Sequence, residues 1–177
     1  KEKGYWKGIS FHSNSALNEL DRVYVGFAGG NPLPDMGNIR TSVAITGTSY
    51  SGSSVKIRNS SFNESAGYGI YVAGKSTLDL FHANYFNNNA LSALYVPADQ
   101  LHKLDFFTHY TGNNGFDGIE TGGTVNADNE VTWSYFSDGS NYLVTSDIII
   151  ESGVHIAEGA TFEFARDVVV KVVGDGY

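Results

Sequence analysis

The stretch VKIRNSSFNESAGYGIYV, residues 55–72, decides the fold because the chain repeats its pattern twice more. The two further copies are LDLFHANYFNNNALSALYV at 78–96 and LDFFTHYTGNNGFDGIET at 104–121. A period in the twenties is typical of a solenoid, in which each repeat buries its apolar face against its neighbours. The repeat predicts one continuous stack of similar units.

The columns of this alignment indicate strands. Aligned from their C-terminal ends, the copies place Ile70, Leu94 and Ile119 together, at spacings of 24 and 25 residues. Each copy begins with alternating apolar and polar residues, which is typical of a half-buried strand, and a second strand pattern follows after a turn rich in Asn, Ser and Gly. Antiparallel sandwiches would carry hairpin signals between unlike segments. We therefore expect an all-β parallel β-helix with coils of about 22–26 residues and no helices.

The pattern extends over the whole chain. We expect a single β-helix domain over 1–177, with regular coils over about 20–123, a side loop over about 124–141 and further coils over 142–177. Strands stack about 4.8 Å apart, so six or seven coils predict a rod of roughly 30 Å. The last residues follow a strand without a polar cap. We therefore expect an incomplete solenoid whose exposed edge strands associate end to end.

Composition excludes several classes of function. The 177 residues carry a formal charge of −8, and the 11 Lys and Arg residues are scattered, which argues against a nucleic-acid partner. No apolar run approaches the ~20 residues of a membrane span. The chain has no Cys, so it forms neither a disulfide framework nor a thiolate metal site.

Several segments resemble a known family. WKGISF at 6–11, LDRVYVGFAGG at 20–30, the repeat at 55–72 and VHIAEGATFEF at 154–164 resemble bacterial secreted right-handed parallel β-helix repeat proteins. Many members are lipoproteins or surface proteins of undefined activity. The resemblance implies right-handed coils, a pectate-lyase-like scaffold and an extracellular or cell-surface location. The same scaffold carries pectate lyases, polygalacturonases and adhesins, so the fold does not assign a function.

The sequence lacks the motifs of the two common enzyme families on this scaffold. Pectate lyases use R-x-P-x-x-R, and polygalacturonases use N-T-D, D-D, G-H-G and R-I-K; none occurs here. The candidates for catalysis are Asp79 and Asp105, which the alternation places at one outward position on successive coils. A pair about 5–9 Å apart would suit glycoside hydrolysis. Lys56 precedes them in the column, so a solvated charged face explains the set equally well.

Outward tyrosines are the candidates for ligand binding. Tyr71 and Tyr95 are expected one above the other, Tyr68 lies nearby, and Glu120 occupies the equivalent position on the next coil. An aromatic ladder suits sugar rings, which stack on aromatic faces and hydrogen-bond to hydroxyl groups. The alternative is that these tyrosines shield the strands and stack on one another.

Polar residues in the turns suggest structure rather than chemistry. An Asn ladder that bonds the backbone of adjacent coils is predicted at Asn63, Asn87, Asn88, Asn89, Asn113 and Asn114. His82 and His109 lie in related turns and could approach each other, but no zinc-binding spacing is present. A Ca²⁺ site is the alternative left open, because hard cations bind clustered oxygens, but Asp21, Asp35, Asp128 and Asp138 are dispersed along the chain. We expect no cofactor and no metal.

Three functions remain. The first is a non-catalytic secreted or cell-surface module, a rigid scaffold that displays a face for a polysaccharide or a surface protein. The second is a polysaccharide lyase or glycoside hydrolase that uses outward carboxylates. The third is a purely structural segment of an adhesin. The first requires an accessible Tyr71/Tyr95 face, and the second requires a groove flanked by loops, for which 29–37 and 124–141 are the nominees.

Overall fold

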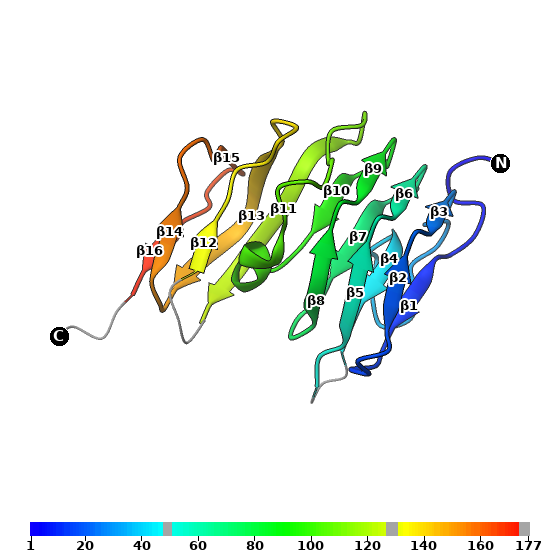
Figure 1. The fold of residues 1–177 in the computed structure, drawn as a ribbon, viewed down its shortest axis with the longest axis horizontal. Helices are drawn as coiled ribbons and strands as arrows, with labels where there is room; N and C mark the ends of the chain where they lie inside the picture. Colours follow the sequence, from blue (N-terminus) through cyan, green and yellow to red (C-terminus); the bar gives the residue numbers. More distant parts are fainter. Residues whose placement is uncertain (48–50, 127–130, 174–177) are drawn as a thin grey trace.

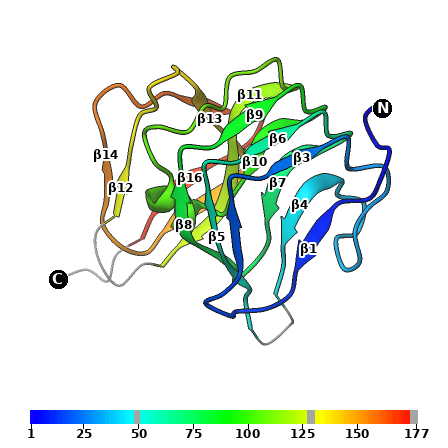
Figure 2. The same cartoon turned by 45° about the vertical axis from the view of Figure 1, so that its right-hand side comes forward.

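The computed structural model describes residues 1–47, 51–126 and 131–173. These residues form an all-β parallel solenoid of about 5 turns, as the repeats predict (Figures 1 and 2). The turns are fewer than the six or seven expected because some coils are longer than 26 residues. Ile9, for example, pairs with Val43, 34 positions later.

The largest sheet, here called the long sheet, runs the length of the solenoid in the order β1-β4-β7-β10-β11-β13-β15, and β16 also pairs with β13. All of these pairs are parallel. The strands are β1 (Ile9–Phe11), β4 (Thr41–Ile45), β7 (Tyr68–Val72), β10 (Ser92–Tyr95), β11 (Phe116–Val125), β13 (Asn141–Ile150), β15 (Phe162–Phe164) and β16 (Val170–Val172).

Three smaller sheets complete the coils. The second sheet contains β2 (Glu19–Asp21), β5 (Ser54–Arg58) and β8 (Thr77–His82), and the third contains β3 (Tyr24–Gly26), β6 (Ser61–Asn63) and β9 (Tyr85–Asn87). The last is a pair, β12 (Val131–Trp133) with β14 (Val154–Ile156). β12 lies within the segment expected to be a side loop. The paired strand therefore corrects that expectation for residues 131–133.

The core is a stack of equivalent side chains from successive coils. Leu94 lies opposite Ile70 on one side and Ile119 on the other, and all three are fully buried, so the predicted column is confirmed. Phe62 and Phe86 stack with their ring centroids 5.4 Å apart, and Tyr110 follows at 5.6 Å. Each coil thus buries its apolar side chains against the coils above and below, which explains why the pattern must repeat.

The coils turn corners at residues with left-handed backbone. One corner column has φ of 56°, 52° and 50° at Arg22, Asn59 and Ala83. A second has φ of 63°, 57°, 52° and 58° at Phe27, Glu64, Asn88 and Asn113. Left-handed backbone costs a non-glycine residue roughly 1–2 kcal/mol, so packing and hydrogen bonds on either side of each corner must impose it.

The expectation of a chain without helices is wrong at one place. A 3₁₀ helix, η1 (Ala98–Lys103), lies against β8 and β12, and its Leu101 is buried in the core. Pro97 precedes it, and a fixed proline φ suits the start of a helix. No helix among the described residues is long and apolar enough to cross a membrane.

The two ends of the described solenoid differ. At the N-terminal end, Trp6 donates its Nε1 hydrogen to the carbonyl of Gly26 over 2.8 Å, so the first residues lie along the end of the first coil. At the other end, apolar side chains are exposed: 54% of Phe164 and 72% of Val172. A hollow of about 310 Å³ opens there among apolar side chains, including Trp133 and Phe162.

Candidate functional site

The candidate ligand-binding residues share one column on the outer face of the long sheet. Parallel pairing places Tyr71, Tyr95, Glu120, Leu143 and Glu163 opposite one another on β7, β10, β11, β13 and β15. We call this series the outward column. Its first four side chains are half-buried and the last is exposed, whereas the neighbouring positions in β7, β10 and β11 point into the core.

The tyrosines at the start of the column form a cluster. The Tyr71 and Tyr95 rings lie 4.3 Å apart and 8° from parallel, as the ladder prediction requires. Tyr68 meets both rings edge-on, at 5.3 and 6.3 Å. The facing sides of Tyr71 and Tyr95 therefore contact each other, as expected for tyrosines that stack on one another. A sugar ring cannot stack between them.

A loop closes the other side of Tyr71. Leu33 and Met36, from the loop nominated at 29–37, bury Ala44 of β4, and Tyr71 packs against this apolar group. Because Ala44 lies directly opposite Tyr71 in the sheet pairing, the loop forms a wall beside the tyrosine cluster. On the opposite side of the cluster, Tyr95 lies next to Glu120 of β11.

Glu120 is held in place by two hydroxyl groups. Tyr68 donates its hydroxyl hydrogen to Oε2 over 2.8 Å, and Ser92 donates to Oε1. Hydrogen bonds to an ionised acceptor are stronger than neutral ones, so both partners fix the carboxylate in one orientation. The four ligand-binding candidates thus lie together. The three tyrosines contact one another, and the Glu120 carboxylate is hydrogen-bonded to Tyr68.

The environment keeps these tyrosines protonated. Burial, the approach of Tyr95 and the charge of Glu120 raise the pKa of Tyr71 to about 12. Burial and the Glu120 charge also raise the pKa of Tyr68, and burial raises that of Tyr95. All three phenols therefore remain hydrogen-bond donors throughout the physiological pH range.

A hollow of about 300 Å³ lies beside Glu120. Its walls come from β10, β11, β13 and the turns before β10 and β11: Ala90, Leu91, Ser92, Gly115, Phe116, Glu120 and Leu143. Sequence reasoning missed Phe116, Leu91 and Leu143, because only the tertiary register brings them beside the carboxylate. Ligand sites generally combine apolar walls with a few fixed polar groups, and this hollow has that composition.

The pairing expected of Asp79 and Asp105 is wrong. Val55 pairs with Leu78 but Lys56 pairs with Leu80, so Asp79 is the extra residue of a β-bulge. One coil later, the bridge between Tyr85 and His109 places Asp105 beside Phe81 and His82 instead of beside Asp79. Because of the bulge residue and the helix η1, the true register of this coil differs by two positions from the alignment of the sequence repeats, which places Asp79 with Asp105.

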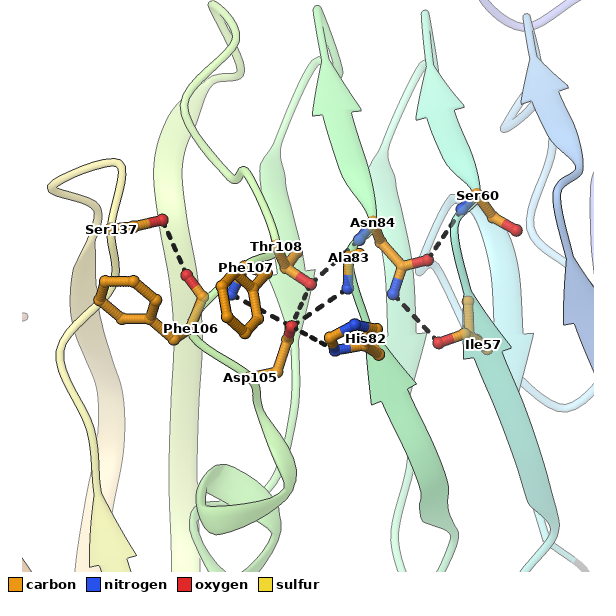
Figure 3. A network of polar contacts seen from close by, with 10 residues as sticks. All are labelled: Ile57, Ser60, His82, Ala83, Asn84, Asp105, Phe106, Phe107, Thr108 and Ser137. Carbon is orange, nitrogen blue, oxygen red and sulfur yellow. Dashed lines mark hydrogen bonds and ion pairs between the residues drawn. The ribbon is translucent and has the colours of Figure 1, made fainter.

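Asp105 instead holds a corner of the solenoid together (Figure 3). Its carboxylate accepts hydrogen bonds from the backbone N–H groups of Ala83 and Phe107, each over 3.1 Å, and from the Thr108 hydroxyl. It also pairs with Nδ1 of His82 at 2.9 Å, and only 15% of its side-chain surface is exposed. His82 therefore approaches Asp105, while His109 stacks on Tyr85 at 4.8 Å.

Asparagine ladders connect the coils, partly as predicted. Oδ1 of Asn89 accepts from the backbone N–H of Ser65 over 3.0 Å, and Oδ1 of Asn114 accepts from the backbone N–H of Asn89 over 3.0 Å. Asn84 forms a second ladder that the sequence analysis missed. It accepts from the Ser60 N–H over 3.1 Å and donates to the Ile57 carbonyl (Figure 3). In the sequence, this ladder could have been predicted from the 24-residue spacing of Ser60 and Asn84, which equals the repeat period.

The other four predicted ladder residues have different roles. Asn88 and Asn113 occupy left-handed corners, and Asn88 also accepts a hydrogen bond from Nζ of Lys3 over 2.9 Å. Asn63 and Asn87 lie opposite each other in the third sheet. Their recurrence therefore reflects backbone conformation and strand pairing more than side-chain bonding between coils.

No group of three or more possible metal ligands is present within the described ranges. Two of the four dispersed aspartates have structural partners. Asp21 pairs with Arg58 at 3.2 Å, and Asp138 accepts from the backbone N–H of Tyr110 over 2.6 Å. Asp128 lies outside the described residues.

A second exposed aromatic group lies on another face. Phe106 meets Phe107 and Tyr135 edge-on, with ring centroids 5.5 and 5.3 Å apart, and all three side chains are exposed (Figure 3 shows the two phenylalanines). The adjacent phenylalanines were visible in the sequence. This group lies beside the corner held by Asp105, through the contacts of Phe107 with Asp105 and His82. The Asp105 carboxylate is already hydrogen-bonded within the fold, in contrast to the partly free carboxylate of Glu120.

Comparisons with known proteins found no match: no family model, no curated protein and no solved structure is detectably similar to this chain. A function must therefore be argued from the geometry of the site alone.

Proposed function

We propose that this chain is a non-catalytic module that binds a glycan on the outer face of its long sheet. One observation carries the proposal. The Glu120 carboxylate, fixed by the Tyr68 and Ser92 hydroxyls, forms one wall of a hollow of about 300 Å³ whose other walls include Phe116 and Leu143.

This combination suits a pyranose ring. A sugar ring presents apolar C–H groups on its faces and hydroxyl groups at its rim, so it binds best where an aromatic or aliphatic wall meets a hydrogen-bond acceptor. Phe116 and Leu143 provide the wall, and the remaining lone pairs of Glu120 accept hydrogen bonds from vicinal hydroxyls. Because Glu120 is already oriented, binding costs little side-chain entropy at this position.

The scaffold adds length and rigidity. Neighbouring strands of the long sheet place successive outward positions about 4.8 Å apart, so an extended polymer lying along the solenoid axis passes several of them. The core beneath is fully buried at Ile70, Leu94 and Ile119, which keeps the outward positions fixed relative to one another.

The geometry favours binding over hydrolysis by the aspartates. Asp105 accepts hydrogen bonds from Ala83, Phe107 and Thr108, so its lone pairs are occupied by the fold. Asp79 lies at a bulge in a different position of the coil. A two-carboxylate mechanism requires both groups to face one scissile bond, and the strand register does not place Asp79 opposite Asp105.

A location outside a bacterial cell, in a secreted or surface-anchored protein, is part of the same proposal. Its support is the resemblance of the repeat and its flanking motifs to secreted β-helix proteins. The proposal differs from a purely structural adhesin segment in one respect: it requires the hollow beside Glu120 to be open to solvent when the protein is in place.

Affinity electrophoresis tests the proposal, with neutral, acidic and cationic polysaccharides cast separately into native gels. We expect selective retardation by at least one polymer, lost in Phe116→Ala and Glu120→Gln. Tyr135→Ala is the matched control, because it removes an exposed aromatic side chain from the other group. If no polymer retards the folded protein, or if all three variants lose retardation equally, the site is not the glycan-binding face.

A further inference from the structure

We infer that the ligand of this site is a cationic glycan, a chain of amino sugars whose ammonium groups bind Glu120 and Glu163. The inference rests on the proposed function and names the ligand class of the same site. It depends on three observations: the charges along the outward column, the unused capacity of Glu120, and the distance between the two glutamates.

The charges along the column have one sign. From Tyr71 to Glu163, the outward column contains two carboxylates and no Lys or Arg. Within the described ranges, the ion pairs of Arg and His are made with carboxylates elsewhere, such as Glu19 and Asp105. A glycan carrying carboxylate or sulfate groups would meet this face with like charge, so the column selects against acidic polymers.

Glu120 retains the capacity to bind a cation. Each of its oxygens accepts one hydrogen bond, from Tyr68 or Ser92, and an ionised carboxylate has about four acceptor positions. A neutral hydroxyl would satisfy the remaining positions, but an ammonium group does so with a charge-assisted bond roughly twice as strong. The half-buried position of Glu120 reduces the screening of that charge by water.

Glu163 provides a second anchor at a suitable distance. Glu120 lies opposite Leu143, and Leu143 lies opposite Glu163, so two strand spacings, about 10 Å, separate the glutamate backbones. In an extended β-1,4-linked chain, equivalent groups on one side recur every second sugar, at a similar distance. Asn141 donates to Oε1 of Glu163 over 3.1 Å, which orients this exposed carboxylate.

This register assigns a place to the intervening sugar. Leu143 lies between the two glutamates and lines the hollow, so the C–H face of one ring would rest on it while the ammonium groups of its neighbours reach Glu120 and Glu163. The glycan would run along the solenoid axis, across β11, β13 and β15. The stacked pair Tyr71 and Tyr95 would bound the site at one end.

Isothermal titration calorimetry at low ionic strength tests the inference with three tetrasaccharides of one linkage. These are the β-1,4 tetramers of glucosamine, N-acetylglucosamine and glucose. We expect the glucosamine tetramer to bind at least about tenfold more tightly than the other two, and Glu120→Gln to remove most of that preference. Glu163→Gln is expected to weaken binding less, because Glu163 is exposed.

Glu158→Gln is the matched control, because it removes the same charge from an exposed turn outside the column. Equal weakening by Glu158→Gln would show unspecific attraction to an acidic protein and overturn the inference. Equal binding of tetralysine would also overturn it, because the site would then recognise charge without a sugar. Glutamine preserves an acceptor at each position, and thermal melts identify any variant that is not folded.

Failure of the inference and failure of the proposed function give different results. If the glucose tetramer binds as tightly as the glucosamine tetramer and Phe116→Ala weakens both, the glycan site stands but the amino-sugar assignment is wrong. If no tetramer binds the folded wild-type protein, both are wrong. Release of shorter sugars during the titration would contradict a non-catalytic module.

Discussion

Tyr68 donates its hydroxyl hydrogen to the Glu120 carboxylate over 2.8 Å, although the two residues lie 52 positions apart in the chain. The bond crosses β10, which lies between β7 and β11 in the long sheet. A polar side-chain bond across an intervening strand orients both groups, and in this chain it fixes the carboxylate at the wall of the hollow.

Removing that bond should weaken both folding and binding. Tyr68→Phe preserves the ring contacts with Tyr71 and Tyr95 but leaves Oε2 of Glu120 without its donor. We expect the free energy of unfolding to fall by about 1 kcal/mol, and glycan affinity to fall severalfold as Glu120 becomes mobile. Chemical denaturation and calorimetry measure the two effects. Tyr24→Phe, at an exposed tyrosine of β3, is the control and should change neither.

The two aspartates once paired as catalytic candidates should respond differently to substitution. Asp105→Ala leaves the backbone N–H groups of Ala83 and Phe107 without acceptors, so we expect about 2–4 kcal/mol of destabilisation. Asp79→Ala removes an exposed side chain and should remain within about 0.5 kcal/mol of wild type. Urea denaturation of both variants measures the difference. Similar losses of stability would contradict the structural role assigned to Asp105.

The repeat predicted the fold well because its information is periodic. The columns of Ile70, Leu94 and Ile119 and of Phe62 and Phe86 recur at a fixed spacing, and a core that stacks on itself requires that spacing. The outward tyrosines and Glu120 were found by the same alternation. Chains that bury one face per strand reveal their inward and outward positions directly in the sequence.

Prediction failed where the period changed by one or two residues. A β-bulge at Asp79 and the helix η1 displaced the alignment of Asp105, and one such slip moves a side chain to a different position on the coil. The hollow could not be predicted, because Leu91, Phe116 and Leu143 meet only through the register of three strands. Local sequence patterns do not determine that register across turns of uncertain length.

A corner residue provides a test of the backbone strain. Ala83 has φ of 50°, a conformation that glycine adopts without the steric cost of a Cβ atom. Ala83→Gly should therefore raise the free energy of unfolding by up to about 1 kcal/mol. Ala73→Gly, outside the left-handed corners, should lower it by roughly 0.5–1 kcal/mol. A lower thermal midpoint for Ala83→Gly than for wild type would contradict the assigned corner conformation.

Asp138 predicts how stability depends on pH. Burial alone would raise its pKa, but hydrogen bonds from Ser140 and from the backbone of Thr111, Ser140 and Tyr110 outweigh burial and lower the pKa below 3.8. The unfolded chain therefore holds this proton more readily than the folded one. The stabilisation by Asp138 is fully present above pH 3.8 and is lost as the pH falls through the lower folded value.

Asp138→Asn makes that contribution measurable. The variant should be less stable than wild type at pH 7, and the difference should shrink as the pH falls below about 4, because the unfolded wild-type chain then binds this proton more readily than the folded protein does. Urea denaturation across this range measures the difference in unfolding free energy. A difference that does not depend on pH would mean that the charge of Asp138 contributes nothing to stability.

The exposed apolar end of the described solenoid predicts self-association. Phe164, Val170 and Val172 lie on β15 and β16 and are 41–72% exposed, and exposed edge strands of this kind readily pair with other strands. We expect the molar mass from light scattering to rise with protein concentration. Val170→Lys with Val172→Lys should restore a monomer, because charges on an edge strand oppose pairing.

Leu17→Lys is the control for these substitutions and should leave association unchanged. It replaces an apolar side chain that is 91% exposed but lies outside this end. A wild-type protein that stays monomeric at millimolar concentration would show that this end does not associate.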